Sequence, residues 1–543
     1  MKWKVAFAGI IWTVLGGCSL GDERNPRVFR YNESANLTSL DPAHARSLEP
    51  MWVTDQIFDG LVELTSELKV APLIAQSFEV DSSGTIWEFV LRDDVFFPRT
   101  PGIPGLEKDR RLVAEDVVFS LERLRDLDVA SSGQWILESV DSEAPFGGIQ
   151  AIGIDTVVIT LKSPFPPFLG LLTTSYANIV APEAVRHFGV DFRSHPVGTG
   201  PFRLAWWVED VACVLHRNPS YWEKDSSGQS LPYLEAVHID FALDMGAEYQ
   251  GLLQGRYDFM SGLHAAYMEE LLDDSGQLRP EHQGTIRLEK VPFLKTDYIG
   301  LFLGEVNDEN NWNPTQDSRI RRAMSWAIDR KGLARHLRRG AVVPTDHFVP
   351  PGLLGLQHKR EEPVRRLSEA RLLVDSVKAD HTESWPSLLL STTSDYTDLC
   401  AALQFQWKEI GLDVEIEVLS ATVHRERVAQ GDAMMFRKSW LADYADAENF
   451  LALFASRNFA PGGPNYTHFS SPRYDAVFQR AMKERNPDQR DALHRELDAM
   501  VADELPVIPL FHDQVTHFIR HEISGWSISP TNRLDLRRVR KRD

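Results

Sequence analysis

The chain has 543 residues, 43% hydrophobic and 25% charged, which is the composition of an ordinary folded protein that is too long for a single hydrophobic core. Its formal net charge of −20 at pH 7 argues against a nucleic-acid partner, because nucleic acids are bound by basic surfaces. We therefore expect a protein of about three domains that binds no nucleic acid.

The N-terminus has the layout of a secretory signal. A basic start (MKWK) precedes an apolar run that is too short to span a membrane comfortably, and the run ends in LGGC at residues 15–18. This tetrapeptide resembles the lipobox of bacterial lipoproteins, whose cysteine is acylated and becomes the mature N-terminus. We predict a signal peptide at 1–17, lipidation of Cys18 and a polar linker at 18–26, with a plain signal peptide as the alternative.

The next part of the chain mixes short strands with helices. VFRYN at 28–32 is typical of a strand, and a helical stretch lies within 52–64. Apolar runs at 85–97 and 154–169 indicate strands, while 112–127 (LVAEDVVFSLERLRDL) places its apolar residues on one helix face. The expected elements that follow are two strands within 197–223 and one strand within 233–243.

From about residue 298 helices and strands alternate. A helical region at 319–340 precedes a strand at 387–394, a helix at 396–412 and a strand at 413–420. A strand, helix and strand of these lengths form a βαβ unit, which favours a parallel sheet covered by helices. We predict an α/β protein with more than one domain.

Residues 440–450 read WLADYADAENF and follow an apolar, strand-like run, AMMFRKSW. Three acids among aromatics at the end of a buried strand fit a binding site for a positively charged group better than a solvated turn. Acid pairs can also serve glycoside hydrolysis, but the common catalytic motifs of nucleophilic, metal and phosphate chemistry are missing from the sequence. An enzyme therefore stays a remote alternative.

Several stretches, taken together and in order, resemble the large oligopeptide, dipeptide and nickel-binding family of extracytoplasmic solute-binding proteins of ABC transporters. The likeness covers nearly the whole mature chain. It is carried by the segments at 39–64, 72–97, 114–124, 196–222, 318–333, 348–352 (FVPPG), 439–450, 470–482 and 505–511 (LPVIPLF). One departure is that Ala445 and Ala447 stand where the family usually has prolines.

The resemblance implies a two-lobed periplasmic-binding-protein fold, hinged by two crossings of the chain, with an extra domain on lobe one. Carried over, the boundaries place lobe one at 27–64, 195–297 and 505–543, the extra domain at 65–194, and lobe two at 298–504. The change of texture near residue 298 supports the last boundary independently.

The resemblance also implies a peptide clamped between the lobes by main-chain hydrogen bonds. Asp443 matches the carboxylate that meets the ligand's ammonium group, and Asp446 fits a helix cap better. Trp440 is expected as pocket wall or core, and Arg437 as a partner of the ligand's carboxylate or a surface arginine. Strand residues Ser439, Trp440 and Leu441 would offer backbone groups, and from the other lobe so would Arg46, Ser47 and Leu48.

The function implied is that of the substrate-binding component of an ABC importer, which captures peptides and delivers them to a membrane permease and its ATPase. No cofactor is implied, and we expect an extracytoplasmic monomer attached to the membrane through the lipid on Cys18 only. A nickel chelate, haem, an opine or a sugar remains the alternative ligand within the same class.

Overall fold

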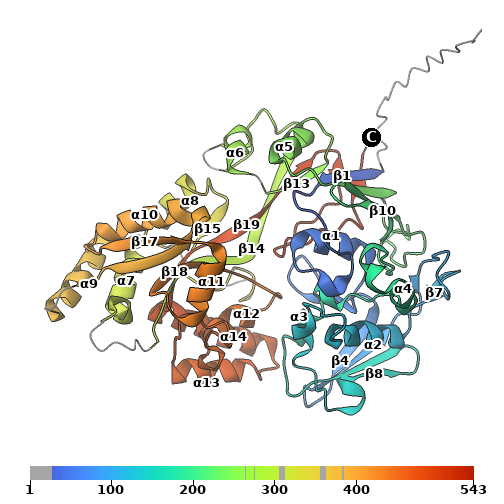
Figure 1. Ribbon diagram of the computed structural model, residues 1–543, viewed down its shortest axis with the longest axis horizontal. Coiled ribbons are helices and arrows are strands. Elements are labelled where there is room, and N and C mark those ends of the chain that lie inside the picture. The colour runs from blue at the N-terminus through green and yellow to red at the C-terminus, as the bar shows by residue number, and fades with distance from the viewer. Residues whose placement is uncertain are drawn as a thin grey trace, which may run out of the picture.

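A computed structural model of the protein describes residues 27–262, 264–273, 276–304, 312–354, 363–381 and 385–542. The predicted signal peptide, Cys18 and the linker at 18–26 lie outside the described residues. The described chain forms two lobes that lie side by side (Figure 1). No helix in the described parts of the chain is long and apolar enough to cross a membrane.

A single mixed sheet of eleven strands runs through both lobes. Its order is β10-β11-β12-β1-β13-β19-β14-β18-β16-β17, and β15 pairs with β19. These strands are β1 (Val28–Asn32), β10 (Phe202–Val208), β11 (Ala212–Arg217), β12 (Ala236–Asp240), β13 (Phe259–Ser261), β14 (Ile286–Leu301), β15 (Val342–Pro344), β16 (Leu388–Thr393), β17 (Val414–Leu419), β18 (Met435–Leu441) and β19 (Val507–Arg520).

Lobe one carries strands β10 to β13 with β1, together with a second sheet in the region predicted as the extra domain. That four-stranded sheet has the order β4-β5-β9-β8 and is antiparallel throughout. The elements of lobe one outside the large sheet are α1 (Leu48–Ile57), β2 (Val62–Leu64), β3 (Val70–Pro72), β4 (Ala75–Val80), β5 (Ile86–Leu91), β6 (Phe96–Phe97), β7 (Arg110–Arg111), α2 (Ala114–Glu122), β8 (Ile149–Ile152), β9 (Thr156–Thr160), α3 (Phe168–Leu171), α4 (Pro182–Phe188), α5 (Met245–Leu253), α6 (Ala265–Leu271), β20 (Ile523–Ser524) and β21 (Arg540–Lys541).

Lobe two packs its helices around the other end of the large sheet. Its βαβ prediction is confirmed, because β16 and β17 pair in parallel on either side of α10. The helices are α7 (Ser318–Ala327), α8 (Arg330–His336), α9 (Leu367–Asp380), α10 (Thr397–Lys408), α11 (Ala421–Gln430), α12 (Glu448–Leu451), α13 (Pro472–Ala481) and α14 (Pro487–Glu504).

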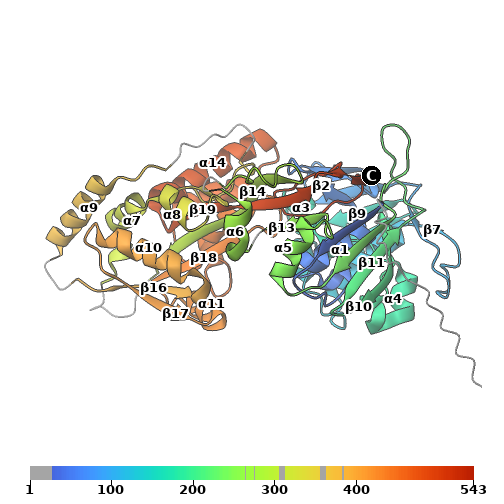
Figure 2. The same ribbon diagram turned by 90° about the horizontal axis from the view of Figure 1, so that it is seen from above.

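Strands β14 and β19 are the two crossings between the lobes (Figures 1 and 2). Their antiparallel register shifts between Pro292 and Thr296, and irregularities of this kind bend a strand. At this break Lys295 of β14 forms an ion pair with Asp513 of β19. A second irregularity follows between Asp297 and Tyr298, and the hinge predicted from the family fold stays a prediction for this strand pair.

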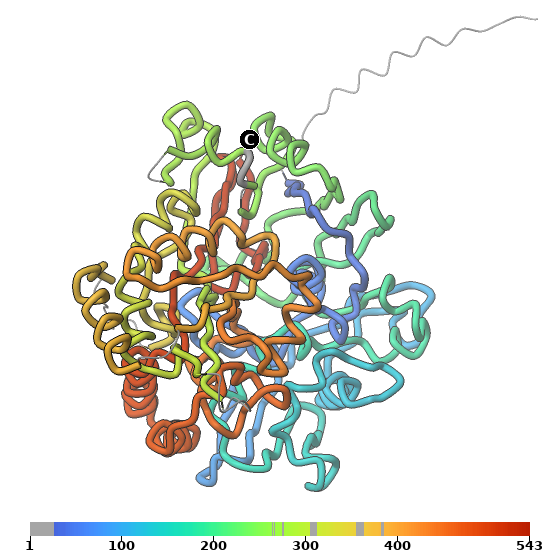
Figure 3. The backbone as a smooth tube through the Cα atoms, turned by 60° about the vertical axis from the view of Figure 1, so that its left-hand side comes forward, coloured from blue at the N-terminus to red at the C-terminus, as the bar shows by residue number. Residues whose placement is uncertain are grey.

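The hydrophobic cores follow the lobes. In lobe one a continuous cluster includes Leu61, Ile74 and Phe202, so residues 65–194 share a core with their neighbours on both sides. In lobe two, β18 separates two clusters, with Met435 in one and Phe436 in the other. Figure 3 shows the C-terminal segment ending close to the N-terminal strand, where Lys541 Nζ lies 2.8 Å from Asp258.

The two cysteines of the described chain, Cys213 and Cys400, are both buried free thiols. Each lies in an apolar cluster, Cys213 in that of lobe one and Cys400 in that of lobe two. Burial raises the pKa of the Cys213 thiol to about 12. A thiol in this state is a small core residue, and we assign neither cysteine a part in the site.

Candidate functional site

Strand β18 has one edge that is only partly covered. On one side it pairs with β14 along its whole length, from Met435 to Leu441. On the other side the register with β16 ends at Phe436. Among the described residues no strand pairs with the remainder of that second edge, so the end of β18 presents an unpaired row of backbone groups.

The alternation of an antiparallel ladder identifies those groups. Ala442 N–H donates to Leu294 C=O (2.9 Å) and Phe302 N–H donates to Met434 C=O (3.0 Å), so the even-numbered residues of β18 direct their backbone groups toward β14. The odd-numbered residues then direct theirs to the second edge. Arg437 C=O is covered there by His424 Nε2 at 2.9 Å. Ser439 and Leu441 remain with N–H and C=O groups on the open edge.

This geometry corrects the prediction for Trp440. Its backbone pairs with Thr296 of β14 and is not available to a ligand, because a one-residue step along a strand reverses the direction of its hydrogen bonds. Its side chain is half-buried against a core cluster of lobe two, and the indole Nε1 donates to Asn449 Oδ1 at 2.9 Å. The ring is therefore a fixed wall at the end of the strand.

Asp443 follows the open edge directly. The residue is exposed to solvent, but neighbouring atoms keep part of the water away from its carboxyl, and this raises its pKa above the ordinary value. A hydrogen bond from Asn449 acts in the opposite direction and lowers the pKa. That bond joins Asn449 Nδ2 to Asp443 Oδ2 at 3.3 Å, and no Lys, Arg or His among the described residues forms an ion pair with the carboxyl. A ligand can reach this exposed carboxyl, and no neighbouring cation is among the causes of its pKa shift.

Tyr466 is an aromatic residue near this carboxyl. Burial and the charge of Asp443 both raise the pKa of Tyr466, which places that phenol near the carboxyl. The ammonium of Lys438 lies 4.3 Å above the Tyr466 ring, and burial is the first cause that lowers its pKa. Tyr466, from another part of lobe two, is thus added to the acids and aromatic residues of the segment 440–450.

Asp446 has the structural role expected of it. Its Oδ1 accepts a hydrogen bond from Glu448 N–H at 2.9 Å, at the start of α12, and its two oxygens pair with Arg490 at 2.8 Å each. Burial alone would raise the pKa of Asp446, but Arg490 lowers it below the ordinary value. Both carboxyl oxygens of Asp446 are therefore paired with a cation, in contrast to those of Asp443.

Tyr444 reaches the other lobe. Its ring stacks on Trp135, with centroids 6.3 Å apart and an interplanar angle of 27°, and lies against Gly170 of α3. Its hydroxyl donates to Glu448. A second contact between the lobes is made by Arg485 and the β4–β5 turn. Arg485 Nη1 donates to Ser82 C=O at 2.6 Å, and Nη2 donates to Asp81 C=O at 2.9 Å. Asp443 therefore lies next to the place where lobe two touches lobe one.

Arg437 is a buried residue and not the surface arginine of the alternative prediction. It is 7% exposed, its guanidinium forms an ion pair with the buried Asp297 of β14, and it lies 3.0 Å from the centroid of the Tyr396 ring. A surface arginine is excluded by this burial. The ion pair with Asp297 uses Nη2 of the guanidinium, and a contact of Arg437 with the ligand's carboxylate stays a prediction.

Residues 46–48 do not form the strand expected from lobe one. Arg46 and Ser47 are exposed and lie in irregular backbone, and Leu48 is the first residue of α1. Ser47 occupies the N-cap position, a place that favours serine, and Pro50 lies in the first turn, where proline is tolerated. The expected strand is absent at 46–48 because α1 starts at Leu48, although the Ser47 side chain makes no cap hydrogen bond. A contact of these residues with a ligand stays a prediction.

A hollow of about 780 Å³ opens between the lobes beside this turn. One wall is the β2–β3 turn of lobe one, with Leu68 and Lys69, and the other is α14 with the backbone of 445–447. Figure 1 shows α12 on the side of lobe two that faces lobe one. The segment after β18 thus borders open space between the lobes.

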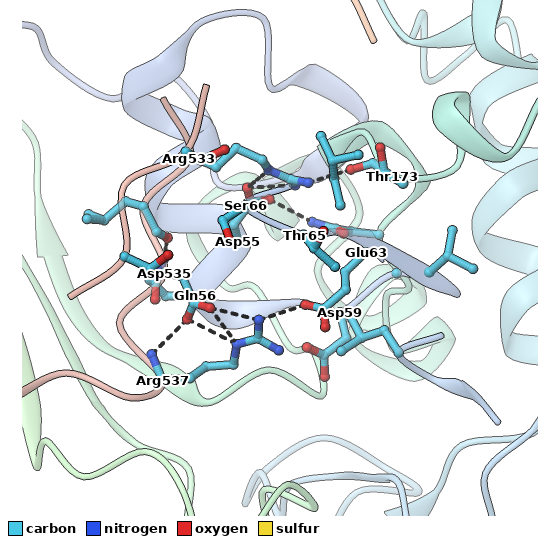
Figure 4. A pocket seen from close by; sticks show the side chains of 18 of the residues that line it. Asp55, Gln56, Asp59, Glu63, Thr65, Ser66, Thr173, Arg533, Asp535 and Arg537 are labelled. Carbon is cyan, nitrogen blue, oxygen red and sulfur yellow. Dashed lines mark hydrogen bonds and ion pairs between the residues drawn. The ribbon is translucent and has the colours of Figure 1, made fainter. Parts of the chain in front are cut away.

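A smaller pocket of about 310 Å³ lies within lobe one (Figure 4). Its charges satisfy one another: Arg533 Nε donates to Asp55 at 2.9 Å, and Arg537 pairs with Glu63 and Asp535. Arg533 Nη1 also donates to Thr173 C=O at 2.6 Å. Because the arginines that line the pocket are already paired with carboxylates, they offer no free cation to a ligand.

The sequence did not point to three residues that complete the candidate site. Asn449 contacts both Trp440 and Asp443, Tyr466 borders the carboxyl, and Trp135 receives Tyr444. For Asn449 the sequence contained one weak indication: it is a polar residue that is followed by two apolar residues in the same short helix. The other two come from distant segments and had none.

Comparison of the sequence with known proteins identifies a family. Residues 69–461 match the bacterial extracellular solute-binding proteins, family 5 Middle. The chain is 24% identical over 504 residues to the glutathione-binding protein GsiB of Salmonella typhimurium, covering 91% of each chain. It is 23% identical over 544 residues to the oligopeptide-binding protein OppA of Bacillus subtilis, covering 94% of each.

Among solved structures, the fold is similar to that of DppA from Helicobacter pylori, an ABC transporter-associated periplasmic binding protein in complex with the peptide STSA. The TM-score is 0.71 at 22% identity, covering 95% of this chain and 98% of that one. A likeness at this identity concerns the fold, and the match over residues 69–461 decides the family. The chain belongs to family 5 of the bacterial extracellular solute-binding proteins, the substrate-binding proteins of ABC importers.

Proposed function

We propose that the protein binds peptides that have a free amino terminus, by adding them as a strand to the open edge of β18 and pairing their ammonium group with Asp443. The observation that carries the proposal is the position of Asp443, an exposed carboxyl without a cation, directly after an unpaired strand edge. Two relatives support the ligand class by name, one as an oligopeptide-binding and one as a glutathione-binding protein.

The strand edge explains affinity that does not depend on side chains. Ser439 and Leu441 each offer one N–H and one C=O, which are the groups that a peptide backbone complements in strand addition. Leu441 is 46% exposed, so its side chain also lies open to a ligand. The backbone supplies binding to any sequence, and the side chains nearby supply preference.

Asp443 makes the amino terminus the fixed end of the ligand. A carboxylate that loses its water on ligand binding is costly unless a cation replaces the water. A peptide ammonium supplies that charge, whereas an acetylated terminus supplies a neutral amide and leaves the carboxylate uncompensated. Recognition of the amino terminus requires no contact of the ligand with Arg437, whose guanidinium pairs with Asp297.

The carrier role rests on the family. We propose that the protein closes around its ligand by bending β14 and β19 and delivers it to an ABC permease and its ATPase, as an extracytoplasmic monomer attached to the membrane through lipid on Cys18. The boundaries 27–64, 195–297 and 505–543 for lobe one, 65–194 for the extra domain and 298–504 for lobe two belong to the same proposal. Neither a cofactor nor a catalytic step is part of it.

Calorimetry with a matched pair of peptides tests the ligand site. Wild type and Asp443→Asn are titrated with trialanine and N-acetyl-trialanine. We expect wild type to prefer the free terminus by about ten-fold or more, which is the usual range for a hydrogen-bonded charge, and D443N to lose most of this preference. Equal affinity of D443N and wild type for trialanine contradicts the ammonium site.

The ligand that co-purifies with the protein gives an independent test. Mild denaturation releases it, and mass spectrometry identifies it. Peptides with free amino termini are the expected result. A dominant nickel chelate, haem, opine or sugar would contradict the peptide assignment and favour another ligand class within the same family.

A further inference from the structure

Asn449, in the first turn of α12, makes three hydrogen bonds to the candidate site. Its Oδ1 accepts from the indole Nε1 of Trp440 at 2.9 Å and from the backbone N–H of Asp443 at 3.2 Å. Its Nδ2 donates to Asp443 Oδ2 at 3.3 Å. One buried side-chain amide, 6% exposed, therefore binds both the aromatic wall and the carboxyl.

The chemistry of its partners fixes the orientation of this amide. An indole N–H and a backbone N–H can only donate, so the group that faces both of them must be the amide oxygen. The amide nitrogen is then left facing the carboxylate, which accepts. Rotation of the amide by 180° would place N–H against N–H twice and oxygen against oxygen once, so a single orientation satisfies all three contacts.

The backbone of Asn449 is held as firmly as its side chain. Its N–H donates to Asp446 C=O at 3.1 Å, and Asp446 is in turn paired with Arg490. The next two residues, Phe450 and Leu451, are fully buried in a core cluster of lobe two. The amide is thus presented from a rigid point, which is what holding a binding group in place requires.

We propose that Asn449 is the positioning residue of the ammonium site: its amide holds the Asp443 carboxyl and the Trp440 ring in one arrangement and so sets the preference for ligands with a free amino terminus. This inference rests on the proposed function. Asn449 donates to Oδ2 of Asp443 and leaves Oδ1 for the ligand, so we assign it a role that acts through Asp443.

The preference for a free terminus is the first readout. Asn449→Ala is titrated with trialanine and N-acetyl-trialanine beside wild type. We expect N449A to reduce the ratio of the two affinities by about ten-fold, since a hydrogen bond to a charged group is lost and the carboxyl is free to turn away. A change that merely loosened the fold would weaken both peptides alike and leave the ratio unchanged.

The pH dependence is the second readout. Partial loss of water around its carboxyl raises the pKa of Asp443 and the Asn449 amide lowers it, so removal of the amide raises it further. Since the ammonium is bound by the ionised carboxylate, we expect the fall of trialanine affinity on the acid side to begin at a higher pH in N449A than in wild type. Asn449→Asp keeps the acceptor for Trp440 but places a second carboxyl against Asp443, so its acid limb moves further in the same direction.

Asn458→Ala is the matched control, because Asn458 also donates one side-chain hydrogen bond, to Ala452 C=O at 2.9 Å, away from Asp443. It is expected to keep the wild-type ratio and pH profile. If D443N loses the preference and both N449A and N449D keep it together with the wild-type acid limb, the role of Asn449 is overturned while the ammonium site stands. If D443N itself keeps the preference, the ammonium site fails and the role of Asn449 falls with it.

Discussion

Trp135 of lobe one and Tyr444 of lobe two stack on each other with ring centroids 6.3 Å apart, and Tyr444 is the residue immediately after Asp443. The group that we assign to the ligand's ammonium is therefore one residue from a contact between the lobes. In the proposed function, ligand binding and closure of the lobes are therefore joined through a single short turn. Asn449 holds this turn on one side and Asp446 holds it on the other.

We expect Trp135→Ala to shift the lobes toward an open arrangement. A stacked aromatic pair contributes about 0.5–1.5 kcal/mol, which corresponds to roughly a two- to ten-fold change in the ratio of closed to open molecules. Small-angle scattering of the ligand-free protein measures this as a larger radius of gyration. Stopped-flow displacement of bound peptide gives a second measurement of the shift, and we expect faster release from W135A than from wild type.

Trp206→Ala is the control for Trp135→Ala, because Trp206 is an exposed tryptophan of lobe one on the edge strand β10, in contact with His238. It removes a ring of the same size and is expected to leave the scattering curve as in wild type. An unchanged radius of gyration in W135A would show that the stack does not hold the lobes together.

The buried pair of Arg437 and Asp297 predicts a large cost for removing one partner. Arg437→Ala leaves the carboxyl of Asp297 buried without its cation, so we expect a loss of about 3–5 kcal/mol in the free energy of unfolding. The double variant R437M/D297N removes both charges and is expected to be closer to wild type. Chemical denaturation of wild type, R437M, D297N and R437M/D297N measures the coupling between the two charges.

A peptide pair then distinguishes this structural role from ligand binding. If Arg437 is committed to Asp297, trialanine and its C-terminal amide bind wild type with similar affinity. A strong preference for the free carboxylate, lost in R437M/D297N, would instead return Arg437 to the ligand.

Glu448 predicts a decline of stability with rising pH. Burial is the main cause that raises the pKa of Glu448 from 4.5 to about 7. The folded protein therefore holds this proton more tightly than the unfolded chain, so the stabilisation is complete below pH 4.5 and is lost as the pH rises through 7. Because each pKa unit is worth about 1.4 kcal/mol, the loss amounts to at most about 3 kcal/mol.

Glu448→Gln is expected to flatten this part of the stability profile and to raise the unfolding temperature at pH 8 relative to wild type. The amide can still accept from the Tyr444 hydroxyl, which donates to Glu448 in the wild type. Glu426→Gln, at an exposed position of α11, is the control. A decline between pH 5 and 8 as steep in E448Q as in wild type would contradict the assignment.

Gly300 tests the packing of the strand pair that carries the site. A Cβ on Gly300 would lie 2.2 Å from ring atoms of Phe436, its partner across the β14–β18 ladder. We expect Gly300→Ala to lower the stability by about 1–3 kcal/mol, the usual cost of overpacking. Gly284→Ala, which meets no atom within 4 Å, is the control, and thermal unfolding midpoints compare the two. Equal midpoints would show that β14 and β18 can move apart.

Local patterns in the sequence predicted the local structure well. The strand before WLADYADAENF is β18, and the βαβ unit of lobe two is present, because hydrophobic periodicity reports on elements within one segment. The same reasoning explains the error at 46–48. There a register carried over from the family predicted a strand, while the serine before Leu48 and the proline in the first turn were local signals for a helix.

Contacts between distant segments could not be predicted in this way. Asp297 and Arg437 are 140 residues apart, and nothing in either segment identifies the other as its partner. The open edge of β18 depends on where β16 stops pairing, and the stack on Tyr444 depends on a loop of lobe one. Asp443 was named from the sequence, but the residue that holds it in place required the structure.

The central claim is that a peptide pairs with the open edge of β18 at Ser439 and Leu441. Amide hydrogen exchange at single-residue resolution tests it most directly, with and without saturating trialanine. The amides of Lys438 and Trp440 are already paired with β14 and should exchange slowly in both states. The amides of Ser439 and Leu441 should exchange fast in the free protein and become protected when the peptide binds. Bound peptide with no protection at Ser439 and Leu441 would contradict strand addition at this edge.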